Sequence, residues 1–389
     1  MPPKNHALLG ASSAGRWLNC PGSARLTEHM PDRPTKSTQA GTLAHAIAEL
    51  KARKYFVEPM STRTYNSRLK KLRSDPSYDS GMEEATDVYL DHLKERAMSY
   101  PAAPCVALEL KVNYSDIVPE GFGTADCVMI GSGCLDVVDY KNGTGVVVSA
   151  ERNPQMMLYA WGALNYFSPI FGDSIHVIHL SIVQPNAGGV REWSLTVGEL
   201  RDWMENTVRP AAKKAYDGVP EFHSGDWCQF CKARDTCRQQ ANEMFEVEPL
   251  MGTEPTLLTD AEIGEVLARA KSLAAWAKSL EDYVLRSTLS GHPIPGWKAV
   301  AGRKSRVWIG GEDAAFPELQ NRGVAEALLY ERNPVSVAKL EQALGKKLFE
   351  ETAAGLWEDK PSAPALKPES DPRPPYNPAQ AAFEVLDNG

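Results

Sequence analysis

The segment at residues 121–145, "GFGTADCVMIGSGCLDVVDYKNGTG", constrains the fold more than any other part of this chain. Two runs rich in β-branched and apolar residues flank a short glycine-containing turn, which is typical of an antiparallel hairpin. The first run carries Asp126, and the second carries Asp139 and Lys141. The segment therefore predicts two adjacent strands that bring charged side chains into an apolar sheet.

The register of this hairpin decides where its carboxylates lie. If the loop consists of Ser132 and Gly133, the numbers of paired residues sum to 265, and Asp126 lies opposite Asp139. Lys141, two residues beyond Asp139, then projects from the same face. A loop one residue longer would separate the two carboxylates, so the prediction depends on this register.

Other segments of the first 240 residues alternate between helical and strand-like patterns. Ser12 or Ser13 is expected to cap a short helix that Pro21 and Gly22 stop. Helices are predicted at 41–50, 81–98, 153–167 and 196–218, and strands at 105–114, 123–130, 134–141 and 175–185. A single α/β unit is expected from this order, with its boundary at residues 1–248.

The sequence changes character after residue 248. Apolar residues at helical spacing predict an amphipathic helix within 260–291, and 249–358 is expected to form a small α-rich module that includes a hairpin near 296–311. Seven prolines fall in the last 31 residues, so 359–389 is expected to be a disordered tail.

Composition excludes several classes of protein. No run approaches the ~18 consecutive apolar residues that a membrane span needs, and the first residues lack the apolar core of a signal peptide, so a cytoplasmic protein with no membrane partner is expected. The formal charge of −8 means that a nucleic-acid partner must meet a local basic surface. One candidate is the run "SRLKKLR", with Arg68, Lys70, Lys71 and Arg73, which a solvated helix face explains equally well.

The hairpin carboxylates suit a hard divalent ion. Mg²⁺ or Mn²⁺ takes oxygen ligands, here Asp126 and Asp139, and a metal at this place supports hydrolytic cleavage of a phosphodiester. Lys141 would orient the attacking water and offset charge on the phosphate oxygens. The alternative is an exposed edge strand whose acids pair with Lys141, but the neighbouring apolar residues favour burial, where charges need a partner or a metal.

The motifs "GTAD" and "VVDYKNG" resemble the RecB-like branch of the PD-(D/E)XK nuclease superfamily. The resemblance implies an α/β restriction-endonuclease-like core, with a mixed sheet flanked by helices, and DNA as the substrate. It also implies that His45 in "GTLAHAIAEL" is a metal ligand beside Asp126 and Asp139. Gln155 and Tyr159, four residues apart in "NPQMMLYA", match the QxxxY motif, whose side chains contact the DNA or hold the lysine.

Seven cysteines, an odd number, favour metal binding over disulfides in a reducing compartment. Three of them, Cys228, Cys231 and Cys237, cluster in "DWCQFCKARDTC". Together with Cys20 in "NCPGS" they resemble the four-cysteine iron–sulfur motif found in a subset of these nucleases. Four thiolates suit tetrahedral zinc or a [4Fe–4S] cluster equally by count, and the resemblance favours the cluster.

The resemblance covers about residues 10–240 and includes CRISPR-associated adaptation nucleases, AddB-type nuclease domains and phage recombination exonucleases. It implies an enzyme, a Mg²⁺- or Mn²⁺-dependent deoxyribonuclease from a phage or prophage, which resects duplex ends as an exonuclease in recombination or repair. A single-strand annealing or single-strand-binding protein is the expected partner beside DNA. The alternative is a catalytically inactive DNA-binding or scaffold protein with a structural zinc or iron–sulfur site.

Glu109, in the predicted strand "ALELKV", has two interpretations. Some relatives place an acidic residue on a strand upstream of the hairpin, which would bring Glu109 to the metal. Equally, Glu109 and Lys111 share one face of a strand, and a simple ion pair would account for both.

Overall fold

In the computed structural model, the described residues are 7–31, 36–245, 259–300, 312–322, 345–354 and the single positions 329, 337, 340, 341 and 356. They fall into two units, residues 1–299 and 300–389. The predicted boundary at residue 248 lies outside the described residues, and so does the predicted tail at 359–389. The helix at 260–289 belongs to the first unit.

A five-stranded mixed sheet forms the centre of the first unit, and the sequence predicted four of its strands. Its strands are β1 (Cys105–Asn113), β2 (Phe122–Gly131), β3 (Cys134–Tyr140), β4 (Val177–Gln184) and β5 (Gly189–Thr196), in that spatial order. β3 and β4 are parallel, and the other neighbours are antiparallel. The parallel pair requires a crossover, which the helix α6 supplies. The sequence did not predict β5, in which the charged Arg191 lies on the same, partly buried side as Trp193 and Leu195 and so breaks the apolar alternation.

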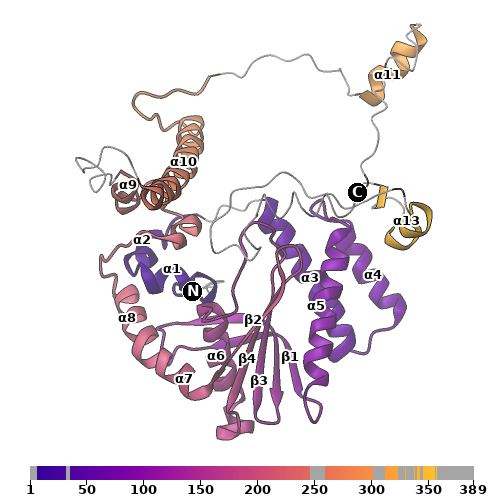
Figure 1. Ribbon diagram of the computed structural model, residues 1–389, viewed down its shortest axis with the longest axis vertical. Coiled ribbons are helices and arrows are strands. Elements are labelled where there is room, and N and C mark those ends of the chain that lie inside the picture. The colour runs from indigo at the N-terminus through magenta and orange to yellow at the C-terminus, as the bar shows by residue number, and fades with distance from the viewer. Residues whose placement is uncertain are drawn as a thin grey trace. The chain divides into compact units, whose positions relative to one another are not determined.

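Helices cover both faces of this sheet (Figure 1). One face packs against α3, α4 and α5, and the other against α1, α6, α7 and α8. The bounds of the first group are α3 (Lys36–Phe56), α4 (Thr62–Arg73) and α5 (Gly81–Met98). The bounds of the second are α1 (Ala14–Asn19), α2 (Gly22–Thr27), α6 (Pro154–Phe171), α7 (Val197–Trp203) and α8 (Arg209–Asp217). Two separate hydrophobic cores result, one on each face of the sheet.

Local sequence explains where several helices begin. Thr196 and Glu199 form a capping box at α7, and Thr259 and Glu262 form another at α10 (Asp260–Leu289). The predicted cap of α1 has the right position, but its side chain makes no capping hydrogen bond. Ser13 occupies the capping position, but its hydroxyl donates to the main-chain oxygen of Gly10 at 3.0 Å instead of accepting from the helix.

One other helical prediction needs correction. The predicted helix at 196–218 is two helices, α7 and α8, separated by a turn of π-helix at Met204–Val208. The predicted stop before Pro21 and Gly22 is confirmed, because α1 ends at Asn19 with Cys20 as its C-cap. A new helix, α2, begins at Gly22, since a proline is tolerated just ahead of the first helical turn. Short 3-10 turns lie at Ala11–Ser13, Gly172–Ser174 and Asp226–Phe230, and α9 spans Arg238–Phe245.

The described part of the second unit is helical. It contains α11 (Glu312–Asn321), with Pro317 inside it, and α13 (Lys346–Thr352). The predicted hairpin near 296–311 lies largely outside the described residues.

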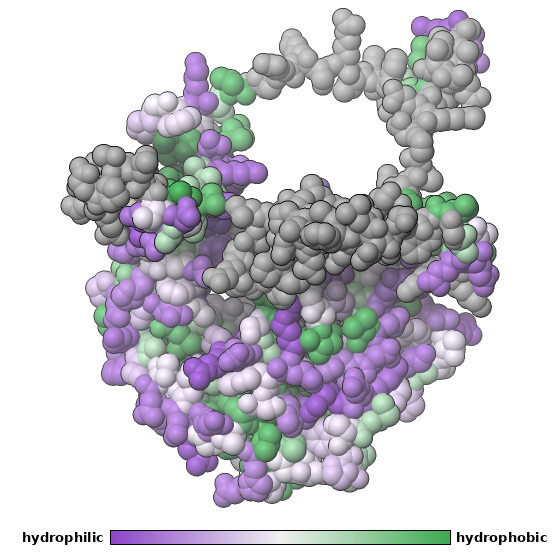
Figure 2. Space-filling view, in the orientation of Figure 1, coloured by the Kyte–Doolittle hydropathy of each residue, from purple (hydrophilic) through white to green (hydrophobic). Residues whose placement is uncertain are grey.

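The visible surface of the described residues carries mainly hydrophilic side chains with small apolar patches between them (Figure 2). None of the described helices combines the length and apolar composition that crossing a membrane requires.

Candidate functional site

The hairpin of β2 and β3 has the predicted register. Gly131 pairs with Cys134, and the pairing continues to Cys127 and Val138. Ser132 and Gly133 form the two-residue loop with φ values of 49° and 83°, as the hairpin turn with two left-handed central residues requires. Asp126 and Asp139 occupy the next positions on their strands. Asp126 Oδ2 accepts a hydrogen bond from the main-chain nitrogen of Tyr140 at 2.8 Å, which fixes the carboxylate against β3.

His45 on α3 reaches the same carboxylate. Its Nδ1 lies 3.3 Å from Asp126 Oδ2. Burial lowers the pKa of His45, but the hydrogen bond and charge of Asp126, aided by the charge of Asp139, outweigh it and raise the pKa above its ordinary value. α3 therefore brings an imidazole to the hairpin, as the resemblance implies.

Asp139 and Lys141 form a buried ion pair. Lys141 Nζ lies 2.8 Å from Asp139 Oδ2, and the carboxylate side chain is 3 % exposed. Burial raises the pKa of Asp139, opposed by Lys141 and reinforced by the charge of Asp126. Burial also lowers the pKa of Lys141, but Asp139 outweighs it and the pKa is raised. The alternative of an exposed edge strand is wrong for this pair, because β3 is paired on both sides and Asp139 is buried.

α6 supplies the remaining two predicted residues. Asn153 caps this helix by accepting from the main-chain nitrogen of Gln155 at 3.1 Å. Gln155 Nε2 donates to Asp139 Oδ1 at 3.3 Å and to Tyr159 Oη at 3.2 Å, while Gln155 Oε1 accepts from Lys141 Nζ at 3.3 Å. Burial, with the charge of Asp139, raises the pKa of Tyr159. Of the two predicted roles of the QxxxY pair, holding the lysine matches the contacts of Gln155.

Glu109 lies at an irregular position of β1, where the strand's side chains switch from one face of the sheet to the other. Its φ is 50°, a left-handed conformation that is rare for a residue other than glycine. It is flanked by the pairs Leu108–Cys127 and Leu110–Ala125, so it lies across from Asp126. Burial raises the pKa of Glu109 to about 7, reinforced by the charges of Asp126 and Glu49.

The predicted ion pair between Glu109 and Lys111 is not formed among the described residues. At Glu109 the side chains of β1 change from one hydrophobic core to the other. The regular alternation that would put Glu109 and Lys111 on one face therefore does not hold here. The acidic neighbourhood of Glu109 thus extends the row of carboxylates from β2 and β3 to a third strand.

The predicted site residues lie close together, and each is already in contact with at least one other: His45, Asp126, Asp139, Lys141, Gln155 and Tyr159. Among the described residues, no group of three or more histidine, cysteine or acidic side chains is arranged to hold a metal ion as it stands. The imidazole of His45 and the carboxylates of Asp126 and Asp139 are nonetheless ligand types that divalent metal ions use. Burial, and secondarily the charge of Asp126, raises the pKa of Asp139 and of Glu109, so a bound cation would favour the ionised form of both.

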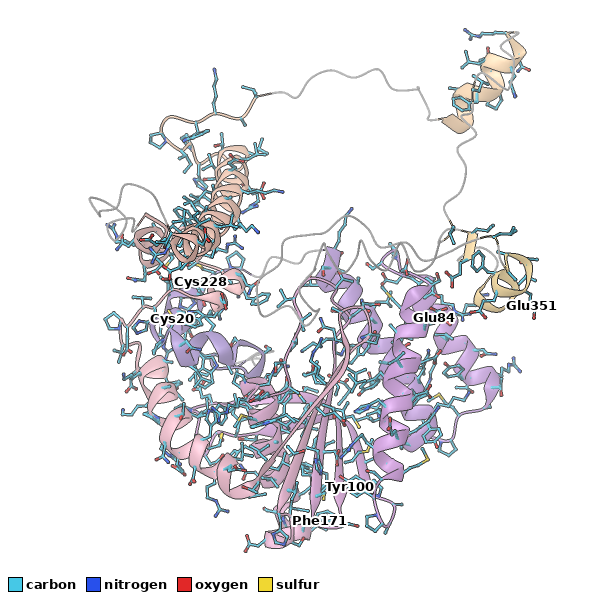
Figure 3. All side chains as sticks on the ribbon, viewed as in Figure 1. Cys20, Glu84, Tyr100, Phe171, Cys228 and Glu351 are labelled. Atoms are coloured by element: carbon cyan, nitrogen blue, oxygen red, sulfur yellow. The ribbon has the colours of Figure 1, made fainter. Side chains whose placement is uncertain are left out.

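The four predicted cysteines also come together. Cys20, Cys228, Cys231 and Cys237 all line one small cavity of about 20 Å³. Cys20 follows α1, whereas the others lie in or after the 3-10 turn at Asp226–Phe230. Figure 3 shows Cys20 next to Cys228. Burial raises the pKa of Cys228 and of Cys231, and neighbouring cysteine thiols reinforce the shift in each.

The segment between these cysteines is attached to α10. Asp235, which is 8 % exposed, accepts a hydrogen bond from the hydroxyl of Ser279 and lies 3.6 Å from Arg286 Nη2. Trp276 Nε1 donates to the main-chain oxygen of Arg234 at 3.2 Å. The cysteine segment therefore joins the N-terminal helices to a helix that begins at residue 260.

The basic run on α4 is only partly available to a polyanion. Arg73 pairs with Glu83 at 2.6 Å, and Arg68 pairs with Glu58 at 3.2 Å. Lys70 and Lys71 are exposed. Half of the predicted patch is thus already neutralised, which favours the solvated helix face.

The chain shares features with known proteins. A solved structure titled "Crystal structure of SSO0001" is similar at 12% sequence identity and a TM-score of 0.26, over 57% of this chain and 95% of that chain. The sequence also matches, over residues 6–374, the family described as "Protein of unknown function (DUF2800)". Because that match spans nearly the whole chain, the protein belongs to the DUF2800 family.

Proposed function

We propose that this protein is a metal-dependent DNA nuclease, an exonuclease that resects duplex ends for recombination or repair. One observation carries the proposal: the pair His45–Asp126 lies within electrostatic range of a second group of contacting residues, which is Asp139, Lys141, Gln155 and Tyr159. They come from α3, β2, β3 and α6, which are separate elements of the fold. Buried charges are costly, and a chain has little structural reason to gather them at one place.

The proposed fold is a PD-(D/E)XK core. Its support is the mixed sheet, in which the hairpin of β2 and β3 is followed by the crossover helix α6 and the parallel strand β4. This order places the acidic residues of the hairpin beside Gln155 of the crossover helix.

His45, Asp126 and Asp139 would hold Mg²⁺ or Mn²⁺. A bound divalent ion polarises the phosphodiester and makes water more acidic. Asp139 is held by both Lys141 and Gln155, so its carboxylate is oriented before substrate arrives. Lys141, which stays protonated because its pKa is raised, is placed to position the attacking water and to offset charge on the phosphate oxygens.

The four cysteines would hold a [4Fe–4S] cluster, with structural zinc as the alternative. The support is that all four line one cavity, although Cys20 is far from the others in sequence. Thiolates are the ligands that both groups use, and the group would join α1 to the segment that carries α10.

DNA is the proposed substrate, and resection would deliver a single strand to an annealing or single-strand-binding protein. The test is cleavage of end-labelled linear duplex DNA and of closed circular DNA, with Mg²⁺ or Mn²⁺ and with EDTA. An exonuclease degrades only the linear DNA, and Asp139→Asn abolishes this degradation because it removes a ligand charge at nearly constant size. Asp173→Asn, at an exposed acid outside the centre, is the matched control and keeps the wild-type rate.

Cleavage of both DNAs would indicate an endonuclease. If neither DNA is cut while DNA still binds, the protein is an inactive DNA-binding or scaffold protein.

A further inference from the structure

A cavity of about 940 Å³ lies between the N-terminal helices and the beginning of β2. Its volume is at the upper end of the ~300–1,000 Å³ range of ligand pockets. Tyr159 lies in its wall, and so does Arg16, which also lines the small cavity of the four cysteines. The larger cavity thus adjoins both candidate centres.

At Tyr159 the cavity meets the candidate active site. Tyr159 Oη accepts a hydrogen bond from Gln155 Nε2, and Gln155 contacts both Asp139 and Lys141. One side chain therefore separates a ligand that touches Tyr159 from the acidic centre.

The charged lining favours an anion. Arg16 has no carboxylate partner among the described residues; its Nη1 donates to the main-chain oxygen of Phe230 at 3.3 Å, and its buried Nε has no hydrogen-bond partner there. Lys232 Nζ donates to the main-chain oxygen of Met30 at 3.1 Å. Glu28 also lines the cavity, but it pairs with Arg25 at 3.0 Å.

Phe122 presents an aromatic ring at this cavity. Its side chain is 38 % exposed, although it begins a strand of the central sheet. The buried Tyr114 donates from its hydroxyl to the main-chain oxygen of Phe122 at 2.8 Å. On either side, glycines leave room for aromatic rings: a Cβ at Gly121 would lie 2.5 Å from the Tyr114 ring, and one at Gly123 would lie 2.8 Å from the Tyr159 ring. The backbone on both sides of Phe122 therefore packs directly against the rings of Tyr114 and Tyr159.

We propose that this cavity binds an unpaired end of a DNA strand, with a base stacked on Phe122 and a phosphate near Arg16. Exposed aromatic rings beside basic side chains are how proteins bind single strands without sequence preference. A duplex hides its base faces inside the stack, so stacking on Phe122 selects single-stranded DNA. This inference rests on the proposed nuclease function, because the strand is the substrate of the adjoining centre.

The test measures binding apart from cleavage. A labelled oligothymidine and a blunt duplex of the same length are titrated, by fluorescence anisotropy in EDTA, against the full-length protein. Phe122→Ala is expected to weaken oligothymidine binding by about 5- to 150-fold, as loss of one stacked base does, and to leave duplex binding unchanged. Phe122→Tyr restores the affinity because it keeps a ring.

Tyr166→Ala is the matched control, since Tyr166 is an aromatic residue that is 58 % exposed on α6 and does not line the cavity. Arg16→Gln is expected to reduce the slope of log affinity against log salt by about 0.7, the value for one phosphate contact on a single strand. Circular dichroism checks that each variant folds.

The outcomes separate this site from the nuclease proposal. Equal oligothymidine affinity of Phe122→Ala and wild type overturns the site, even if the wild type cuts DNA. Weakened duplex binding with unchanged oligothymidine binding overturns it as well. If the wild type never cuts DNA but Phe122→Ala weakens oligothymidine binding selectively, the binding site stands and the nuclease proposal fails.

Discussion

Leu108 and Leu110 lie two residues apart on β1, yet they pack into different hydrophobic cores on opposite faces of the sheet. In a regular strand, residues two apart share a face. Their partners on β2 do the same, since Cys127 packs with Leu108 and Ala125 with Leu110. Glu109 and Asp126 therefore occupy the point where the side chains of both strands switch faces. The acidic residues gather at this irregularity of the sheet.

Glu109→Gln should stabilise the metal-free protein at neutral and higher pH. The pKa of Glu109 is about 7 in the folded chain and near 4.5 when unfolded, so its charge destabilises the fold. Wild-type stability should thus fall as pH rises from about 4.5 to 7. The variant should gain about 1–2 kcal/mol above pH 7, after allowing for partial exposure, and nothing below pH 4.5.

Urea unfolding in EDTA at several pH values measures this gain. Glu151→Gln, at an exposed glutamate, is the control and should follow the wild type throughout. A gain that persists at pH 4 would show that charge repulsion is not the cause.

Lys141→Ala should lower kcat far more than DNA affinity. Its ammonium lies beside Asp139 and Gln155. In the proposed nuclease reaction it would offset charge that develops on the phosphate only during reaction. We expect kcat to fall by about 10²–10³, the cost of removing one such stabilising group, and the Kd for DNA to stay within about threefold. Single-turnover cleavage and anisotropy measure the two quantities, with the exposed Lys111→Ala as control. A matching loss in affinity would contradict the role.

If the four cysteines hold the proposed iron–sulfur cluster or zinc, Cys237→Ser should release that metal and loosen α10. The cavity would lose one of four ligands, while Asp235 and Arg234 connect the same segment to Ser279, Arg286 and Trp276 of the helix. Metal analysis of anaerobically purified protein and hydrogen exchange of the α10 amides check both effects. Cys105→Ser, at an exposed cysteine outside the cavity, should change neither. Full metal content in Cys237→Ser would remove this residue from the ligand set.

Glu83→Gln should weaken the attachment of α4 to α5. Glu83 accepts two hydrogen bonds from Arg73, at 2.6 and 2.7 Å, and one from Tyr78, at 2.5 Å. Arg73, with help from Tyr78, lowers the pKa of Glu83 to about 2 despite its partial burial. The stabilisation is therefore complete above about pH 4.5 and is lost as pH falls toward 2.

At pH 7 the loss should be about 1 kcal/mol, because Arg73 is half exposed and solvent screens the pair. Thermal melts between pH 7 and pH 3 measure it. Glu84→Gln, at the exposed neighbour labelled in Figure 3, is the control. An undiminished difference at pH 3 would mean that packing, not charge, holds the two helices.

The sequence predicted the hairpin because its signal is local. A two-residue loop fixes the register, so Ser132 and Gly133 were enough to predict the pairing from Gly131–Cys134 to Cys127–Val138, one step before Asp126 and Asp139. The switch of faces at Glu109 had no such signal. Glycine normally marks a left-handed backbone conformation, and here a glutamate adopts it because of its surroundings.

The meeting of Cys20 with the downstream cysteines followed from resemblance and not from spacing. Helix packing brings these segments together, and no local pattern encodes that contact. For the same reason no local pattern predicted that Arg16 would line both cavities.

The closure of the N-terminal helices against α8 has a consequence for how the chain is made. Arg25 donates to the main-chain oxygen of Tyr216 at 2.8 and 2.6 Å, and the main-chain nitrogen of Gly22 donates to the oxygen of Glu221 at 2.9 Å. These partners are separated by almost 200 residues, and such distant contacts slow folding. Because a ribosome releases the chain from its N-terminus, α1 and α2 must wait until α8 has emerged. The helices α1 and α2 are thus made before α8 but reach their final position only after it.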